Sequence, residues 1–219
     1  MSDTQDLTLD EIRALLAPAL PRHAAFDGWR PQAVAMAAQE KGVDVDIAQL
    51  AFADGAMGMI DAWFASIDAA MLDALPAEGL SALSIRRRII ALVEARLALL
   101  ASDRDALRRA LAILAMPQNL ARATKLGWRS ADRMWRLAGD MATDYNHYTK
   151  RAMLAGIYGA TITVFLDDES EQWADTRAFL ARRIDGIMRF EKAKAKFTNR
   201  TRGDHRISLS RFVSRLRYP

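Results

Sequence analysis

The side chains with the greatest potential for chemistry lie close together in the second half of the chain. Asp144 and His147 have the three-residue spacing of a carboxylate and histidine metal pair on a helix, and Asp140 could join them only if that helix extended further back. A ferritin-like di-iron centre needs two such pairs and two further acidic ligands. Neither His23 nor His205 has an acidic residue three positions before it. We therefore expect no metal site, and we interpret the pair as a helix start with an exposed interaction face.

Other signatures of catalysis are missing from the sequence. It has no nucleophile elbow, no phosphate-binding loop and no glycine-rich dinucleotide turn. The absence of cysteine excludes disulfides, thiolate metal sites and cysteine nucleophiles, and it suits a reducing compartment. We expect a protein that is not an enzyme and needs no cofactor, with a redox or di-iron enzyme as one alternative.

The polar side chains around His147 are predicted to lie on a helix over residues 143–166. Thr143 is a candidate N-cap, because its side-chain oxygen can accept a hydrogen bond from an unpaired N–H group of the first turn. Four side chains follow at the spacing i, i+3, i+4 and i+7 and are expected to share one side of the helix: Asp144, His147, Tyr148 and Arg151.

Helical periodicity dominates the rest of the chain as well, so the predicted fold class is all-α. Thr8 and Glu11 have the spacing of a capping box, while Pro18 and Pro21 predict a kink or an early end of the first helix. Gly42 is expected to end the second helix. The predicted helices cover residues 8–25, 31–41, 44–51, 55–76, 84–100, 103–115, 130–138 and 171–196 in addition to 143–166.

Residues 26–55 resemble the helix-turn-helix end of TetR-type regulators, because small residues and a glycine turn recur at the spacing that two crossed helices require. A recognition helix must bring Lys or Arg to DNA, whereas residues 44–50 carry two aspartates and no cation. Over residues 27–61, Arg30 and Lys41 stand against six carboxylates. We expect no nucleic-acid binding, and a ligand-responsive transcriptional regulator of TetR type is the alternative function.

Later segments carry a more specific pattern: Ala-Leu-Ala-Ile-Leu-Ala-Met-Pro-Gln-Asn-Leu at 110–120, Met-Trp at 134–135 with Ala-Gly-Asp at 138–140, Thr-Asp-Tyr-Asn at 143–146, and Tyr-Thr-Lys-Arg-Ala-Met-Leu-Ala-Gly-Ile-Tyr at 148–158. These segments resemble the Coq-nine family, accessory lipid-binding proteins of ubiquinone biosynthesis. The resemblance extends from about Leu7 to Lys192. It implies a TetR-like helical bundle without DNA binding, a hydrophobic cavity for isoprenoid lipid, and a C-terminal amphipathic helix that contacts the membrane.

The same resemblance implies a surface patch that binds the di-iron demethoxyubiquinone hydroxylase. His147 stands in this patch at a position where we expect Trp in eukaryotic relatives. The predicted partner-binding residues are Pro117, Asn119, Leu120, Asp140, Asp144, His147, Tyr148, Thr149 and Arg151.

Methionine and aromatic side chains are concentrated in the part of the chain expected to surround the cavity. Such side chains adapt to an irregular, flexible ligand, although residue type alone favours an ordinary core. The resemblance favours the cavity. The predicted lipid-binding residues are Met116, Met134, Trp135, Met141, Met153, Phe165, Phe179 and Met188.

The C-terminal residues are strongly basic. Residues 192–219 carry nine Lys and Arg and one Asp, which gives +8, whereas residues 1–191 sum to −4. If residues 206–217 form a helix, its apolar side chains share about one third of the circumference and arginines flank them, as in helices that lie on anionic membranes. A disordered tail, or one folded back on the body, is the alternative. The predicted membrane-binding residues are Leu209, Arg211, Phe212, Val213, Arg215 and Leu216.

These patterns predict three regions: a helix-turn-helix-like region over 1–55, a ligand-binding helical domain over 56–196 and a basic tail over 197–219, with a homodimer as a possible assembly. The longest uncharged run, 152–166, is shorter than the roughly 20 residues that span a bilayer. The acidic first residues resemble neither a secretory signal nor a transit peptide. We therefore expect a bacterial, cytoplasmic protein that is peripheral on the inner membrane.

Overall fold

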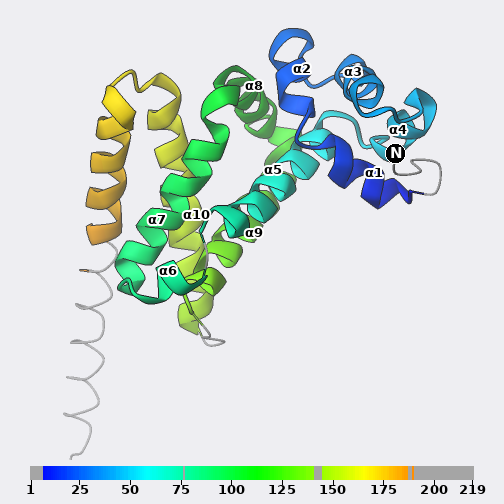
Figure 1. The fold of residues 1–219 in the computed structure, drawn as a ribbon. Helices are drawn as coiled ribbons and strands as arrows, with labels where there is room; N and C mark the ends of the chain where they lie inside the picture. The colour runs from blue at the N-terminus through cyan, green and yellow to red at the C-terminus, as the bar shows by residue number, and fades with distance from the viewer. Residues whose placement is uncertain (1–6, 76, 141–144, 187–188, 190–219) are drawn as a thin grey trace, which may run out of the picture.

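The computed structural model describes residues 7–75, 77–140, 145–186 and 189, and within these the secondary structure is helical without strands. The all-α fold class is confirmed. Figure 1 shows the short helices of residues 9–51 at the N-terminal end, α5 leading away from them, and a bundle of helices beyond it. The helices are α1 (Leu9–Leu16), α2 (Leu20–Asp27), α3 (Pro31–Lys41), α4 (Val45–Ala51), α5 (Gly55–Ala74), α6 (Ala77–Ser81), α7 (Ile85–Leu100), α8 (Arg104–Leu114), α9 (Leu120–Leu137), α10 (Tyr145–Asp167) and residues 174–186, with 3-10 turns at Ala101–Asp103, Pro117–Asn119 and Glu171–Trp173.

Local signals in the sequence place most of the helix ends. The capping box is present, since the Thr8 hydroxyl accepts from the N–H of Glu11 and the Glu11 carboxylate accepts from the N–H of Thr8. Gly42 ends α3 in the left-handed conformation at φ 67°. The first predicted helix is divided into α1 and α2 near Pro18 and Pro21, which confirms an early end rather than one kinked helix.

One predicted helix start was wrong by ten residues. α9 begins at Leu120 and not at residue 130, because its buried side chains Leu126, Ser130 and Met134 repeat at four-residue spacing through Gly127, which the pattern had treated as loop. Asp103 precedes α8 but makes no side-chain cap; its carboxylate instead accepts from the hydroxyl of Ser102.

The four N-terminal helices pack onto the larger bundle through tryptophan. The Trp29 indole N–H donates to the carbonyl of Ala106 in α8 at 3.1 Å, and its ring lies 5.2 Å from that of Trp63 in α5. One continuous set of buried apolar side chains runs through both parts. The packing of buried side chains therefore continues across residue 55. The domain boundary predicted there stays a prediction.

The described helices offer no single segment that is long and apolar enough to cross a membrane. α4 and α5 meet the length and composition requirement only when taken together, and they are bent by 86° at their junction.

Candidate lipid-binding cavity and partner surface

A mostly apolar cavity of about 390 Å³ lies between α8, α9 and α10, with Phe64 of α5 on its wall. The volume falls within the roughly 300–1,000 Å³ of small-molecule pockets. The lining residues are Phe64, Leu111, Leu114, Ala123, Thr124, Leu126, Gly127, Ser130, Ala155, Tyr158, Gly159 and Ile162.

Small residues on the facing sides of α9 and α10 leave this space unfilled. A Cβ atom added to Gly127 would lie 3.9 Å from the Cβ of Ala155, so the two helices approach closely there. At Gly159 an added Cβ would have no neighbour within 4 Å. A larger side chain at any of these three positions would therefore occupy the cavity, since all three line it.

Of the residues predicted to bind lipid, the six that the structure describes are not among the lining residues of this cavity. Met134, Trp135 and Phe165 are buried in the core, where Phe165 packs between Arg104 and Trp173. Met116 is exposed, and Met153 and Phe179 are half-buried. Met141 and Met188 lie outside the described residues. Residue type did not predict which side chains line the cavity, and the small residues that leave the space open were missed. Lipid binding itself stays a prediction.

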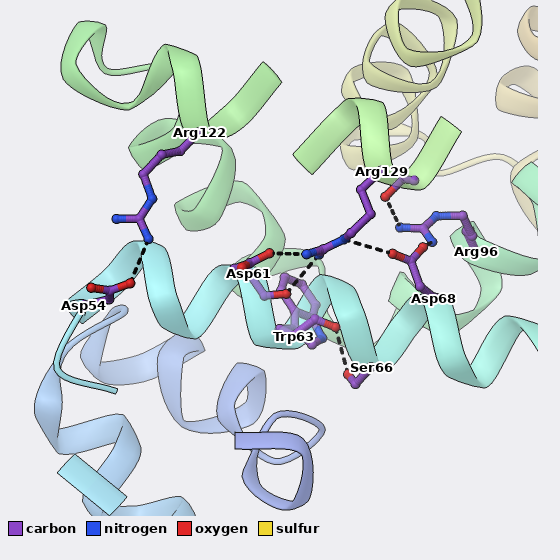
Figure 2. A network of polar contacts seen from close by, with 9 residues as sticks. Asp54, Asp61, Trp63, Ser66, Asp68, Arg96, Arg122 and Arg129 are labelled. Carbon is purple, nitrogen blue, oxygen red and sulfur yellow. Dashed lines mark hydrogen bonds and ion pairs between the residues drawn. The ribbon is translucent and has the colours of Figure 1, made fainter. Parts of the chain in front are cut away.

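A ladder of ion pairs joins α5 to α9 beside the cavity (Figure 2). Arg122 pairs with Asp54 at 3.1 Å, and Arg129, seven residues later, pairs with Asp61, also seven residues later. Asp68 continues the spacing and lies 3.5 Å from Arg129 Nε. Seven residues are close to two helical turns, so each set lies along one helix face. This seven-residue repeat of Asp in α5 and of Arg in α9 is visible in the sequence, and it would have predicted that the two helices pack together.

Arg96 lies next to Asp68 at the end of the ladder (Figure 2). Its side chain is fully buried. It donates to the Asp68 carboxylate, to the Tyr158 hydroxyl at 3.0 Å and to the Ser130 hydroxyl at 3.1 Å. Burial by itself lowers the pKa of Arg96, but Tyr158 and Asp68 outweigh it and raise that pKa above its ordinary value. Arg96 therefore stays charged. No pattern in the sequence predicted this role for Arg96.

The predicted partner surface is partly exposed. Tyr148 has 62% of its surface exposed and packs beside the ring of Trp128, with 5.9 Å between centroids. Pro117 and Leu120 are also exposed, at the start of α9. Asn119 is held inward by donating to the carbonyl of Ile113. His147 and Thr149 are half-buried, and Asp144 lies outside the described residues, as does the predicted cap Thr143.

Arg151 does not belong to that surface, and its placement there was wrong. Its side chain is 1% exposed and donates to both Asp132 and Asp140, so it ties α9 to α10 from inside. Asp140 also accepts from Lys150 and is itself largely covered. Burial by itself raises the pKa of Asp132 and Asp140, but Arg151, together with Lys150 at Asp140, lowers both below the usual range. The side chain of Arg151, at the i+7 position of the predicted set, points inward because Asp132 and Asp140 of the preceding segment lie opposite it.

Within residues 7–75, 77–140 and 145–186 the structure contains no group of three His, Asp or Glu side chains that could hold a metal ion.

Comparison with known proteins identifies the family to which the chain is similar. The model of the COQ9 family matches residues 120–191. The rat "Ubiquinone biosynthesis protein COQ9, mitochondrial" is 45% identical over 96 residues, which are 44% of this chain and 31% of the rat protein. The Drosophila melanogaster protein of the same name is 26% identical over 217 residues, 97% of this chain and 66% of that protein. The matched part of this chain thus spans about a third of the mammalian relative. The resemblance to the Coq-nine family is confirmed.

The fold has a solved counterpart. The crystal structure of a TetR transcriptional regulator from Nitrosomonas europaea superposes with a TM-score of 0.61 at 25% identity, over 80% of this chain and 97% of that chain. The TetR-like fold is therefore confirmed. In this chain the exposed side chains of α4, where a recognition helix would lie, are Asp46, Ile47, Gln49 and Leu50.

Proposed function

We propose, from the match of residues 120–191 to the COQ9 family, that this protein is a non-catalytic accessory protein of ubiquinone biosynthesis. It binds a polyprenylated quinone intermediate and presents it to the di-iron demethoxyubiquinone hydroxylase. The observation that carries the proposal is the position of the apolar cavity. Nine of its twelve lining residues lie within the matched segment.

The size of the cavity limits how much of such a ligand it encloses. About 390 Å³ is at the small end of the range for drug-sized ligands. We infer that the quinone ring and the first part of the prenyl chain enter, while the remaining chain stays in contact with lipid. Each buried CH₂ is worth roughly 0.8 kcal/mol in either apolar environment, so transfer from the bilayer is close to neutral in free energy.

The partner surface in this proposal is the exposed side of α9 and α10 around Tyr148, with Pro117 and Leu120 at the start of α9. Leu120 precedes Trp128 by eight residues, or about 12 Å along the helix. A hydroxylase bound over this span would lie beside the cavity, whose lining includes Thr124 and Gly127 from the same stretch of α9.

Lipid mass spectrometry on the protein purified from membranes tests the proposal directly. We expect a co-purifying prenylated quinone, and the protein carrying Gly159→Leu should lose it. Purified native protein that carries no prenylated lipid would contradict the cavity assignment.

The structural similarity to a TetR transcriptional regulator favours one second candidate, a ligand-responsive regulator. Against it, the exposed side of α4 carries Asp46 and no cation. A gel-shift assay with the upstream DNA of its own gene separates the two functions, because a retarded band that is competed only by that sequence requires the regulator.

A further inference from the structure

Three of the residues lining the cavity carry hydroxyl groups: Thr124, Ser130 and Tyr158. The Thr124 hydroxyl donates to the carbonyl of Leu120 in its own helix at 2.8 Å. The Ser130 and Tyr158 hydroxyls are engaged differently, because both accept hydrogen bonds from the buried guanidinium of Arg96.

A guanidinium can only donate, so it fixes the direction of both hydroxyl groups. With a lone pair of each oxygen occupied by Arg96, the hydroxyl hydrogens of Ser130 and Tyr158 are left to donate elsewhere. Within the described part of the chain, no hydrogen bond takes either of them to a protein acceptor. Both residues are almost fully buried, at 3% and 4% exposed. An unused buried donor is costly, so these two groups favour an acceptor supplied by a ligand.

The charges around Arg96 indicate the kind of acceptor. Arg96 and Arg129 are balanced by Asp61 and Asp68, so the network carries no net charge (Figure 2). A neutral oxygen therefore suits the site better than a carboxylate. A carboxylate would lose its hydration there and would find no unbalanced positive charge to pair with. The remaining walls are largely apolar, contributed by side chains such as Leu111, Leu114 and Ile162.

We propose that Ser130 and Tyr158, oriented by Arg96, form the head-group site of the cavity and donate hydrogen bonds to carbonyl or ether oxygens of a neutral amphiphile. This inference rests on the proposed function, since it names the part of the quinone that the cavity recognises. Ser130 and Tyr158 bind the ligand, and Arg96 is a positioning residue.

Two probes with the same alkyl chain test the proposal: decylubiquinone, whose ring carries acceptor oxygens, and decylbenzene, whose ring carries none. Equilibrium dialysis of the full-length protein against each gives two dissociation constants. We expect the native protein to prefer decylubiquinone by roughly tenfold or more, because each hydrogen bond to a buried donor adds to its affinity. Tyr158→Phe and Ser130→Ala should each reduce this preference several-fold while decylbenzene binding is retained.

Thr124→Val is the matched control, because it removes a hydroxyl from the same cavity whose hydrogen is already bonded to Leu120. It should leave the preference unchanged. Equal affinity of the native protein for the two probes would overturn the head-group site but not the lipid-binding function. An undiminished preference for decylubiquinone in both Tyr158→Phe and Ser130→Ala would have the same meaning. Failure of the native protein to bind either probe would overturn the lipid-binding function and the head-group site together. The native preference is decisive even if a variant does not fold.

Discussion

A Cβ atom on Gly127 would stand 3.9 Å from the Cβ of Ala155, which places α9 and α10 in close approach beside the cavity. The two helices form an antiparallel pair in which Trp135 donates from its indole to the carbonyl of Lys150 at 3.0 Å. Small residues in the middle of this helix pair leave the cavity open, and hydrogen bonds near one end fix the two helices relative to each other.

Gly159→Leu should abolish binding of decylubiquinone without destabilising the protein. The new side chain enters the cavity, and replacing glycine within a helix favours folding by up to about 1 kcal/mol. Gly156→Leu is the matched control, since Gly156 lies in the same helix and is exposed like Gly159, but does not line the cavity. Dialysis and thermal unfolding measure the two effects. Unchanged binding by the Gly159 variant would mean that the ligand lies elsewhere.

Arg151→Ala should lower the free energy of unfolding by about 3 kcal/mol, because it leaves Asp132 and Asp140 without their buried partner. Arg136→Ala removes the other arginine on Asp132, but its side chain is 67% exposed and the cost should stay below about 0.5 kcal/mol. Urea unfolding at neutral pH compares them. Equal losses in the two variants would refute the structural role assigned to Arg151.

Asp168→Asn should flatten the acid dependence of stability. Burial by itself raises the pKa of Asp168, but hydrogen bonds from Ser170 and Thr176 lower it well below the usual range. A carboxylate with a lowered folded-state pKa contributes its full stability above its unfolded value of about 3.9, and that contribution is lost as the pH falls towards the folded value. The native protein should therefore lose more stability between about pH 5 and pH 2 than the variant does.

At pH 7 the same Asp168→Asn variant should be less stable than the native protein by about 2–3 kcal/mol. The NH₂ group of the new amide cannot accept the hydrogen bonds that Thr176 donates to the carboxylate. Asp167→Asn is the control, since the neighbouring Asp167 makes only an exposed pair with Arg108. Urea titrations at several pH values measure both effects. Parallel pH profiles for native protein and the Asp168 variant would contradict the assignment.

Tyr148→Ala should weaken binding of the hydroxylase by roughly tenfold or more, as expected for an exposed aromatic anchor at an interface. Phe26→Ala removes an aromatic side chain that is 85% exposed on α2, far from this surface in sequence, and should have no effect. Calorimetric titration with the purified hydroxylase measures the difference. Identical affinities for the two variants would remove Tyr148 from the partner surface.

Arg211→Glu combined with Arg215→Glu should weaken binding to anionic vesicles by roughly thirtyfold or more, at about 1 kcal/mol for each basic residue near such a surface. Both residues lie outside the described part of the chain, so this prediction comes from the sequence alone. Arg109→Glu with Arg182→Glu changes the net charge equally on exposed positions of the body. Vesicle sedimentation distinguishes the pairs, and equal losses would indicate nonspecific attraction.

The sequence by itself determined the fold class and most helix ends. The Thr8 and Glu11 capping box, Ser84 before α7, and Gly42 after α3 act on backbone groups only a few residues away, so their effect needs no tertiary contact. The family resemblance likewise depends on the order of residues. It was confirmed for residues 120–191.

Only the tertiary structure decided which side chains face the cavity and which face the core. Met134 and Ser130 lie one turn apart on the same side of α9, yet only Ser130 lines the cavity. Arg151 was expected at the surface and is buried, because Asp132 and Asp140 lie opposite it. Helical periodicity gives a side chain its direction, but the helix that lies across from it determines whether it meets a neighbour, an ion partner or empty space.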